Sequence, residues 1–226
     1  ARYSSLLGAT KTFYFGFPDS IPAYLSSEGS VESYQKHSNE WKSFDLEQRD
    51  ATRVIFNYIS TLIDVTFSET TLFEQYNTLA LANNKQGPSS GYAYLPGTSY
   101  TNSDIFIATL SNGGLRIPLD GSWYVDTFIH EIGHAVGLKH PFEKAGSTGT
   151  KSPPPYLEGV EDHAIWTQMS YSGWVKKMEF SPLDIAALQY LYGSNPTSRT
   201  GDNTYDYSST DANFIWDGAG TDTIDA

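Results

Sequence analysis

Three histidines and a glutamate lie close together in the segment HEIGHAVGLKH. Because positions i and i+4 lie on one face of an α-helix, His130 and His134 can bind one metal ion together. Glu131 lies beside them, close enough to reach a water molecule activated by that metal. Gly137 lets the chain leave the helix with a positive φ, so that His140 can turn back to the same ion. Three neutral imidazoles with an open fourth position are typical of a catalytic zinc site.

The chemistry that this set predicts is hydrolysis by a metal-activated water. Zinc lowers the pKa of a bound water toward about 7. Glu131 can then take the proton as a general base and later deliver it to a leaving amine. Two alternatives stay open. A core helix with incidental histidines would bury polar side chains at a cost in desolvation. A purely structural zinc site would not need Glu131 and usually has four protein ligands.

A helix over residues 123–138 must carry this motif, and other periodic segments surround it. A second helix is expected over 45–63, where apolar pairs recur every four residues. A third begins at Ser181, an N-cap serine followed by Pro182 at the first helical position, and ends at Gly193. Strands are expected at 11–17, 65–67, 92–95 and 105–110, loops at 20–40 and 146–155, and a turn-rich break at 83–91.

A methionine follows the motif helix in Met169-Ser170-Tyr171. Together with the extended His-Glu motif, this turn resembles the metzincin metallopeptidases. The resemblance implies that Met169 lies beneath the zinc site as an apolar floor. It also implies a two-lobed α/β (α+β) protease domain, in which a twisted mixed sheet lies above the zinc-binding active-site helix and the cleft separates the lobes.

Further segments resemble one group of metzincins, the serralysins, which are bacterial alkaline proteases exported by type I secretion. Pro141 directly follows the third histidine, Tyr171 lies two residues after the methionine, and residues 184–193 resemble the helix after the turn. The resemblance implies that Tyr171 ligates zinc in the resting enzyme and donates a hydrogen bond to the oxyanion during catalysis. It also implies a secreted, extracellular protein. Lys139 departs from the family, which usually has a small polar residue there.

Residues 199–202 and 216–225 resemble the start of the calcium-binding β-roll of that family. The implied calcium ligands are the carbonyl oxygens of Arg199, Gly201, Asn203 and Ala219 and the carboxylates of Asp217 and Asp222. Six oxygens suit calcium, although a surface Asp/Gly turn without an ion is the alternative for one imperfect repeat. We expect a protease domain over 1–195 and a truncated RTX-like roll over 196–226, so that the chain is a fragment or a form lacking most of the roll.

The segment Tyr92-Ala93-Tyr94 is expected to bind substrate. A peptide in the cleft must satisfy its backbone hydrogen bonds, which an exposed sheet edge offers by strand addition. The segment precedes the zinc helix and resembles the edge strand of the family. An interior strand, paired on both sides, is the alternative.

Composition excludes several other classes of protein. The chain of 226 residues has no cysteine, which excludes disulfides and thiolate metal sites, and its length suits one large domain. Its net charge of −12 disfavours nucleic-acid binding. No apolar run reaches the roughly 20 residues that span a bilayer. We therefore expect a monomer that does not insert into a membrane and has Zn2+ and Ca2+ as cofactors. Its expected partners are protein or peptide substrates, and a proteinaceous inhibitor is a further candidate.

Two histidines outside the motif receive no metal. His37 is interpreted as exposed in a polar loop, and His163 as a surface group or an outer neighbour of the site. The alternative function is a catalytically silent, calcium-stabilised binding or adhesion module with the metzincin shape, and a further one is a fragment that folds only with its missing roll. The intact Glu131, three histidines and Tyr171 favour a zinc endopeptidase.

Overall fold

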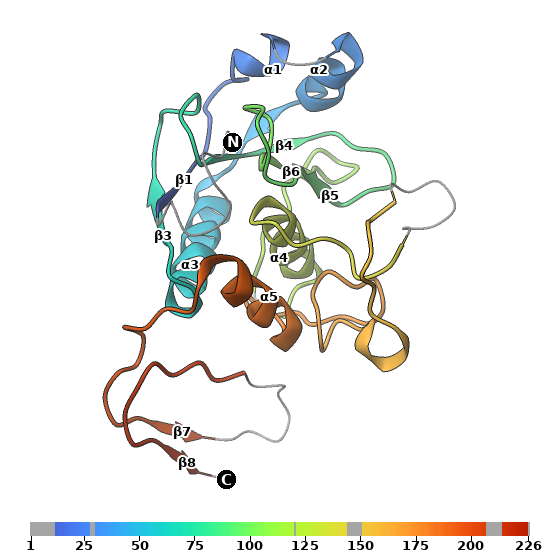
Figure 1. Ribbon diagram of the computed structural model, residues 1–226. Coiled ribbons are helices and arrows are strands. Elements are labelled where there is room, and N and C mark those ends of the chain that lie inside the picture. The colour runs from blue at the N-terminus through green and yellow to red at the C-terminus, as the bar shows by residue number, and fades with distance from the viewer. Residues whose placement is uncertain (1–11, 28–29, 120, 144–150, 207–213, 226) are drawn as a thin grey trace.

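The computed structural model describes residues 12–27, 30–119, 121–143, 151–206 and 214–225. These ranges form two sheets and a set of helices (Figure 1). The helices are α1 (Tyr24–Ser27), α2 (Val31–Ser38), α3 (Leu46–Leu62), α4 (Trp123–Ala135) and α5 (Pro182–Tyr192), with a 3-10 turn at Gly159–Glu161. The strands are β1 (Thr12–Gly16), β2 (Lys42–Ser43), β3 (Thr66–Glu69), β4 (Thr78–Asn84), β5 (Gly91–Ala93), β6 (Ile105–Ala108), β7 (Thr204–Asp206) and β8 (Thr223–Asp225).

The larger sheet is mixed, in the order β3-β1-β4-β6-β5, with the short β2 beside β4. Strands β3, β1, β4 and β6 run parallel, whereas β5 runs antiparallel to β6 and β2 runs antiparallel to β4. Among the described strands β5 is therefore an edge of the sheet. The expected twisted mixed sheet of a metzincin-like α/β domain is confirmed.

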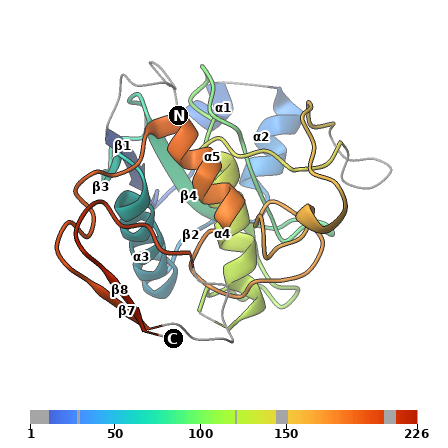
Figure 2. The same ribbon diagram turned by 60° about the horizontal axis from the view of Figure 1, so that its bottom comes forward.

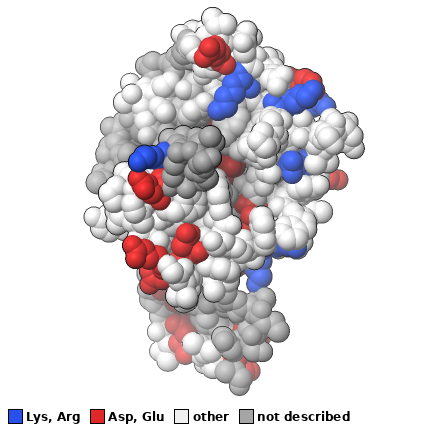
Figure 3. Space-filling model, turned by 90° about the vertical axis from the view of Figure 1, so that its right-hand side faces the viewer, with Lys and Arg blue, Asp and Glu red and all other residues white. Residues whose placement is uncertain are grey.

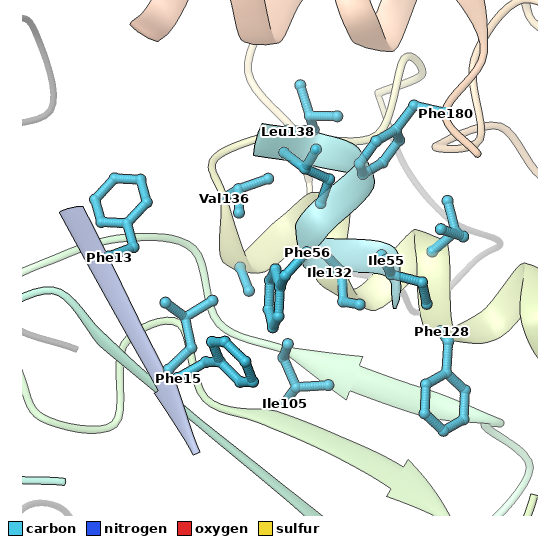
Figure 4. Close-up of a cluster of buried hydrophobic side chains, with 14 of the residues drawn as sticks. Phe13, Phe15, Ile55, Phe56, Ile105, Phe128, Ile132, Val136, Leu138 and Phe180 are labelled. Carbon is cyan, nitrogen blue, oxygen red and sulfur yellow. The ribbon is translucent and has the colours of Figure 1, made fainter. Parts of the chain in front are cut away.

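Helices α3 and α4 cover one face of this sheet and enclose the main core (Figure 1). Figure 4 shows Phe15 of β1 beside Phe56 of α3, with ring centroids 4.6 Å apart, and Ile132 of α4 close to Phe56. The apolar residues of α3 recur on one face, which is why a helix forms there. The helix over 45–63 was thus correctly predicted, and its Asp45 accepts a hydrogen bond from the Gln48 N–H at 2.9 Å.

The other face of the sheet is covered by α1 and α2, and this corrects the expected loop over 20–40 (Figures 1 and 2). Ser30 caps α2 by accepting a hydrogen bond from the Ser33 N–H at 3.2 Å. Tyr24 and Leu25 pack against Phe106 in a second, smaller core. The polar sequence hid these helices because only a few of their residues are buried.

Strand β4 was missed, since its end was interpreted as part of a turn-rich break over 83–91. All of its residues are buried, with other layers on both sides. Asn83 exchanges two amide hydrogen bonds with Gln48 of α3, at 2.9 and 3.0 Å. Asn84 donates to the Tyr92 hydroxyl at 2.8 Å. These partners satisfy the amides, so the low strand propensity of asparagine is overridden.

The segments after α4 build a second lobe below the sheet, where α5 lies against α4 (Figure 2). As predicted, Ser181 caps α5, Pro182 begins it, and Gly193 ends it with a φ of +79°. Residues 151–155 of the expected loop form no regular helix or strand, and residues 146–150 lie outside the described ranges, as does Lys11. In the described part of the chain no helix is both long and apolar enough to cross a membrane.

The small parallel sheet of β7 and β8 projects beyond α3, away from the zinc-motif helix (Figures 1 and 2). Trp216 joins this tail to the domain, because its indole N–H donates to the Asn195 carbonyl at 3.0 Å. Asn195 in turn donates to the Ser60 carbonyl of α3 at 2.7 Å. The domain boundary expected near Asn195 stays a prediction, although the change from α5 to these short strands occurs there.

Candidate metal centre and active site

Helix α4 begins at the N-cap Ser122 and presents His130 and His134 on one face. The rest of the helix is held by burial of Val125, Phe128 and other apolar residues against the sheet. Gly137 follows with a φ of +110°, a conformation that favours glycine. The chain turns there and returns His140 to the face that carries the first two histidines.

The three imidazoles converge on one point. The Nε2 atom of His140 lies 3.1 Å from the Nε2 atom of His130 and 3.1 Å from that of His134. In the described residues this is the only group of three or more His, Asp or Glu side chains whose ligand atoms come together in this way. The predicted metal-binding set is therefore assembled by the fold.

The hydrogen bonds behind the rings fix their tautomers. The Nδ1 atom of His130 lies 2.8 Å from the Gln168 carbonyl oxygen, and that of His134 lies 2.8 Å from the Leu138 carbonyl oxygen. Since a carbonyl accepts only, each Nδ1 must carry the proton and each Nε2 is left with a lone pair. Two such lone pairs, both directed at the Nε2 atom of His140 about 3 Å away, suit a shared cation, so the donor set fits zinc.

Burial also keeps the histidines neutral. It lowers the pKa of His130 to about 3, with the neighbouring His134 adding to the effect. It likewise lowers the pKa of His140 to about 4 and lowers the pKa of His134. Neutral imidazole is the form that binds a metal ion.

Glu131 lies fully buried beside this cluster. Burial raises its pKa to about 8, and a hydrogen bond from the Ala93 backbone opposes that rise. Its Oε2 atom has no hydrogen-bond partner among the described residues. An unpartnered buried carboxylate oxygen is costly and calls for a functional reason. A cation at the histidines would lower this pKa and favour the ionised base.

Met169 packs directly against the zinc-motif helix. A Cβ atom at Gly133 would lie 2.6 Å from the Met169 sulfur, so glycine is needed there for this close approach. The preceding Gln168 carbonyl accepts the His130 hydrogen bond described above. The methionine turn thus packs against the helix that carries the cluster, and the apolar floor under a metal ion stays a prediction.

Asp184 of α5 holds this turn, a role that sequence reasoning missed. Its carboxylate accepts hydrogen bonds from the Thr167 hydroxyl and from the Gln168 N–H, both at 2.6 Å, and from the Ser181 N–H at 3.1 Å. From the sequence, this residue is expected only as part of the helix segment 184–193. Its burial and its three hydrogen bonds show this role in the structure, where a buried carboxylate needs such partners.

Tyr171 lies over the histidines at the mouth of the site. Its ring centroid is 4.9 Å from that of His140 and 5.5 Å from that of His130, and its side chain is 60% exposed. Phe142 stacks on His140 at 4.9 Å and also touches Tyr171. Phe142 was not singled out from the sequence, where its only signal is its position two residues after the third histidine.

Strand β5 forms the upper rim of the cleft. Ser90 and Tyr94 form backbone hydrogen bonds toward β6, at 2.9 and 3.2 Å. Because antiparallel pairing alternates, the backbone groups of Gly91 and Ala93 face away from β6, toward the open side. The described structure gives β5 no neighbour on that side.

His37 was interpreted as exposed, and this is wrong. It belongs to α2, is only 1% exposed, and stacks on Phe106. Its Nδ1 atom lies 3.0 Å from the Tyr92 hydroxyl and its Nε2 atom 3.4 Å from the Tyr94 hydroxyl. Burial, reinforced by the charge of Lys36, lowers its pKa to about 4. His37 therefore anchors Tyr92 of β5 and the following Tyr94 from behind.

The cleft between β5 and the lower lobe has a volume of about 700 Å³. It is lined by the three histidines, Glu131, Tyr171, β5 and three lysines, Lys36, Lys139 and Lys151. Figure 3 views the side of the molecule on which it opens, and the surface is hollowed near the centre of that face. His163 does not belong to this lining; its Nδ1 atom accepts a hydrogen bond from the Ile165 N–H at 3.2 Å.

The residues expected to bind calcium lie together in the tail. The Asn203 N–H donates to Asp222 at 2.9 Å, and the Thr223 N–H donates to the Asn203 carbonyl at 2.8 Å. A Cβ atom at Gly220 would lie 2.5 Å from the Gly201 carbonyl and 3.0 Å from an Asp222 oxygen. Asp217 accepts hydrogen bonds from the Tyr205 hydroxyl and from the Ala219 N–H. Arg199 has a positive φ of 54° in the same loop.

Comparison with known proteins agrees with this geometry. Residues 78–200 match the family described as "Metallo-peptidase family M12B Reprolysin-like". The chain is 32% identical to Serralysin C of Dickeya chrysanthemi over 87% of this chain and 47% of that protein. It is 30% identical to a serralysin of Photorhabdus sp. (strain Az29), and 28% identical to metallopeptidase AprA of Pseudomonas marginalis, each over 89% of this chain. The chain spans about half the length of these curated relatives.

Proposed function

Because the chain belongs to the reprolysin-like M12B metallopeptidase family and is a serralysin-type metzincin, we propose that it cleaves internal peptide bonds of proteins in a zinc-dependent reaction. The observation that carries the proposal is the convergence of three histidine Nε2 atoms in an open cleft, two of them left unprotonated by the hydrogen bonds behind their rings. The free oxygen of Glu131 beside them supports hydrolysis rather than a purely structural site.

In this proposal His130, His134 and His140 hold zinc through their Nε2 atoms. Zinc bound there supplies a Lewis acid that polarises the substrate carbonyl and activates a water molecule. Glu131 accepts a proton from the attacking water on its carboxylate and then donates it to the leaving nitrogen. The Ala93 N–H and the surrounding core keep this carboxylate oriented toward the cleft.

Tyr171 is proposed to act as a zinc ligand in the resting state and as a hydrogen-bond donor to the oxyanion in turnover. Its exposed position over His140 supports a side chain that can move. Tyr171→Phe is expected to lower kcat by about a hundredfold, the usual effect of losing one oxyanion donor, and to weaken zinc binding less. Steady-state kinetics with zinc content measured in the same samples checks this. A variant that loses zinc but keeps kcat per bound metal would show that the tyrosine is only a ligand.

Substrate is proposed to add as a strand along the free edge of β5, with Tyr92, Ala93 and Tyr94 as its binding segment. The support is the open side of β5 and its place directly above Glu131. In this arrangement the backbone groups of Gly91 and the carbonyl of Ala93 pair with the peptide, since the Ala93 N–H already donates to Glu131. The side chains of the two tyrosines face the opposite layer, where His37 fixes them.

Calcium is proposed to join the loop at 199–203 to the turn at 217–222, through the carbonyls of Arg199, Gly201, Asn203 and Ala219 and the carboxylates of Asp217 and Asp222. The support is the proximity of the Gly201 carbonyl to Asp222 and the scarcity of apolar side chains around this turn. Without a cation the carboxylates repel one another, so the tail is held only by a few hydrogen bonds.

A thermal melt tests this site. With zinc kept saturating, millimolar calcium is expected to raise the melting temperature, since a ligand at a hundredfold excess over Kd stabilises the folded state by about 2.7 kcal/mol. Asp222→Ala should remove most of that shift and leave the zinc content unchanged. A midpoint that does not move with calcium, or that moves equally with magnesium, would contradict the proposal.

The site of action is proposed to be extracellular, as the likeness to serralysins suggests, with proteins or peptides as the substrates. The zinc-loaded chain should cut casein at internal bonds, and mass spectrometry of the products would show new termini away from the chain ends. Release of single terminal residues would instead indicate an exopeptidase. A folded, zinc-replete protein that cuts nothing would favour the silent binding module.

A further inference from the structure

Lys36 of α2 reaches over the substrate edge of the sheet. Its Nζ atom lies 3.8 Å from the centroid of the Tyr92 ring and 5.5 Å from that of Tyr94. The lysine lines the cleft together with these rings. Cation–π contacts of this kind hold an ammonium group in place without neutralising its charge.

The charge of Lys36 has no protein counterpart in the described ranges. No hydrogen bond or ion pair of its Nζ atom occurs there, and Glu32, one turn earlier on α2, does not pair with it. Partial burial lowers the pKa of Lys36, with no carboxylate to oppose the effect. A carboxylate brought to this point would therefore offset an existing cost.

The other two lysines of the cleft are already engaged. The Nζ atom of Lys139 donates to the Pro155 carbonyl at 2.7 Å, and that of Lys151 pairs with Glu143 at 2.9 Å. Among the described residues that line the cleft, the only carboxylate is the buried Glu131. The cleft is thus positive in a chain whose net charge is −12. A positively charged cleft in a negatively charged protein favours the binding of an acidic ligand.

The pleat of β5 decides which substrate side chain can reach Lys36. Successive residues of a strand point to opposite faces, and cross-strand neighbours point to the same face. Ala93 packs toward the main core and α4, whereas Tyr92 and Tyr94 pack toward α2. In a peptide added along β5, the residue opposite Ala93 faces the metal site, and a residue opposite Tyr92 or Tyr94 faces Lys36.

A second hollow gives such a side chain room. It has a volume of about 270 Å³ and is lined by Lys36, Asn39, Gln86, Ser89 and Tyr92, among others. Lys36 and Tyr92 line both this hollow and the cleft. The Gln86 amide and the Ser89 hydroxyl in its walls already donate to protein acceptors, and Lys85 pairs with Glu40. The Lys36 ammonium is therefore the charged donor that this hollow offers to a carboxylate.

We propose that Lys36 is a specificity-determining residue that selects an aspartate or glutamate side chain at the substrate position facing Tyr92 or Tyr94. This inference rests on the proposed peptidase function and on strand addition to β5. It concerns one subsite and leaves the bond-breaking chemistry at Glu131 unchanged.

The test uses peptides of one scaffold that carry Glu, Gln or Lys at each position around the cut bond in turn. At one position on the Tyr92 face, kcat/KM for Glu should exceed that for Lys by about tenfold, the value of one charge-assisted hydrogen bond. Lys36→Met keeps the apolar stem over Tyr92 and removes the charge. The kcat/KM values for the Glu and Lys peptides should therefore become about equal. Lys36→Glu should reverse the preference.

Lys42→Met is the matched control, because Lys42 is exposed on β2, bonds the Gly113 carbonyl and does not line the cleft. It should keep the wild-type preference, and that preference should shrink in high salt. Equal cleavage of Glu and Lys peptides by the wild type, or an unchanged preference in Lys36→Met, would overturn this inference and leave the proposed peptidase function standing. Failure of the zinc-loaded wild type to cut any peptide would overturn the proposed function and this inference with it.

Discussion

Glu131→Gln is expected to lower kcat/KM for a peptide substrate by about 10³- to 10⁴-fold while the protein stays folded and keeps its zinc. Glutamine has nearly the same shape as glutamate, so the core around α4 should remain packed. It cannot accept a proton from water, and the reaction loses its base. The measurement is hydrolysis of a fluorogenic peptide, with the zinc content of each sample determined by mass spectrometry.

Glu47→Gln provides the matched control, since it makes the same chemical change on the exposed side of α3. It should keep activity within about twofold of the wild type, as surface substitutions usually have small effects. A zinc-replete Glu131→Gln variant with near-normal turnover would remove Glu131 from the mechanism and would leave the buried, unpartnered oxygen without an explanation.

His134→Ala is expected to abolish both tight zinc binding and peptide hydrolysis. The side chain supplies one of the three converging Nε2 atoms, and its Nδ1 proton is held by the Leu138 carbonyl. Zinc affinity should fall by more than about a hundredfold, because even groups that only orient a ligand contribute about 10- to 100-fold. Competition with a fluorescent zinc chelator measures the affinity.

His163→Ala is the corresponding control, because this histidine lies outside the converging group. Its variant should bind one zinc with wild-type affinity. Equal loss of zinc in the two variants would mean that His163 is a ligand and that the assigned triad is incomplete. Stoichiometric zinc together with full activity in His134→Ala would exclude that histidine from the site.

The zinc motif and its flanking signals could be predicted from the sequence because they follow local rules. The spacing of His130 and His134 is set by the helix repeat, and Gly137 is needed where φ becomes positive. Pro182 and Gly193 mark the ends of α5 for similarly local reasons. These features depend on a few neighbouring residues and hardly at all on the rest of the fold.

Other parts of the fold depend on distant partners and could not be predicted. Asn83 stays within β4 only because Gln48, far away in the chain, satisfies its amide. His37 is in a polar stretch, yet Phe106 and the hydroxyl of Tyr92 bury it. The hydrogen bond from the Gln168 N–H to the Asp184 carboxylate likewise forms only when the fold brings α5 and the methionine turn together.

The central claim is that one zinc ion held by His130, His134 and His140 drives peptide hydrolysis, and a metal titration tests it most directly. The protein is stripped of zinc with a chelator that is then removed, and casein hydrolysis is measured as zinc is added back at constant calcium. Activity should be absent at the start, rise in proportion to added zinc, and level off at about one zinc per chain. Full casein hydrolysis by the zinc-free protein, or no recovery after one zinc per chain has bound, would contradict the account.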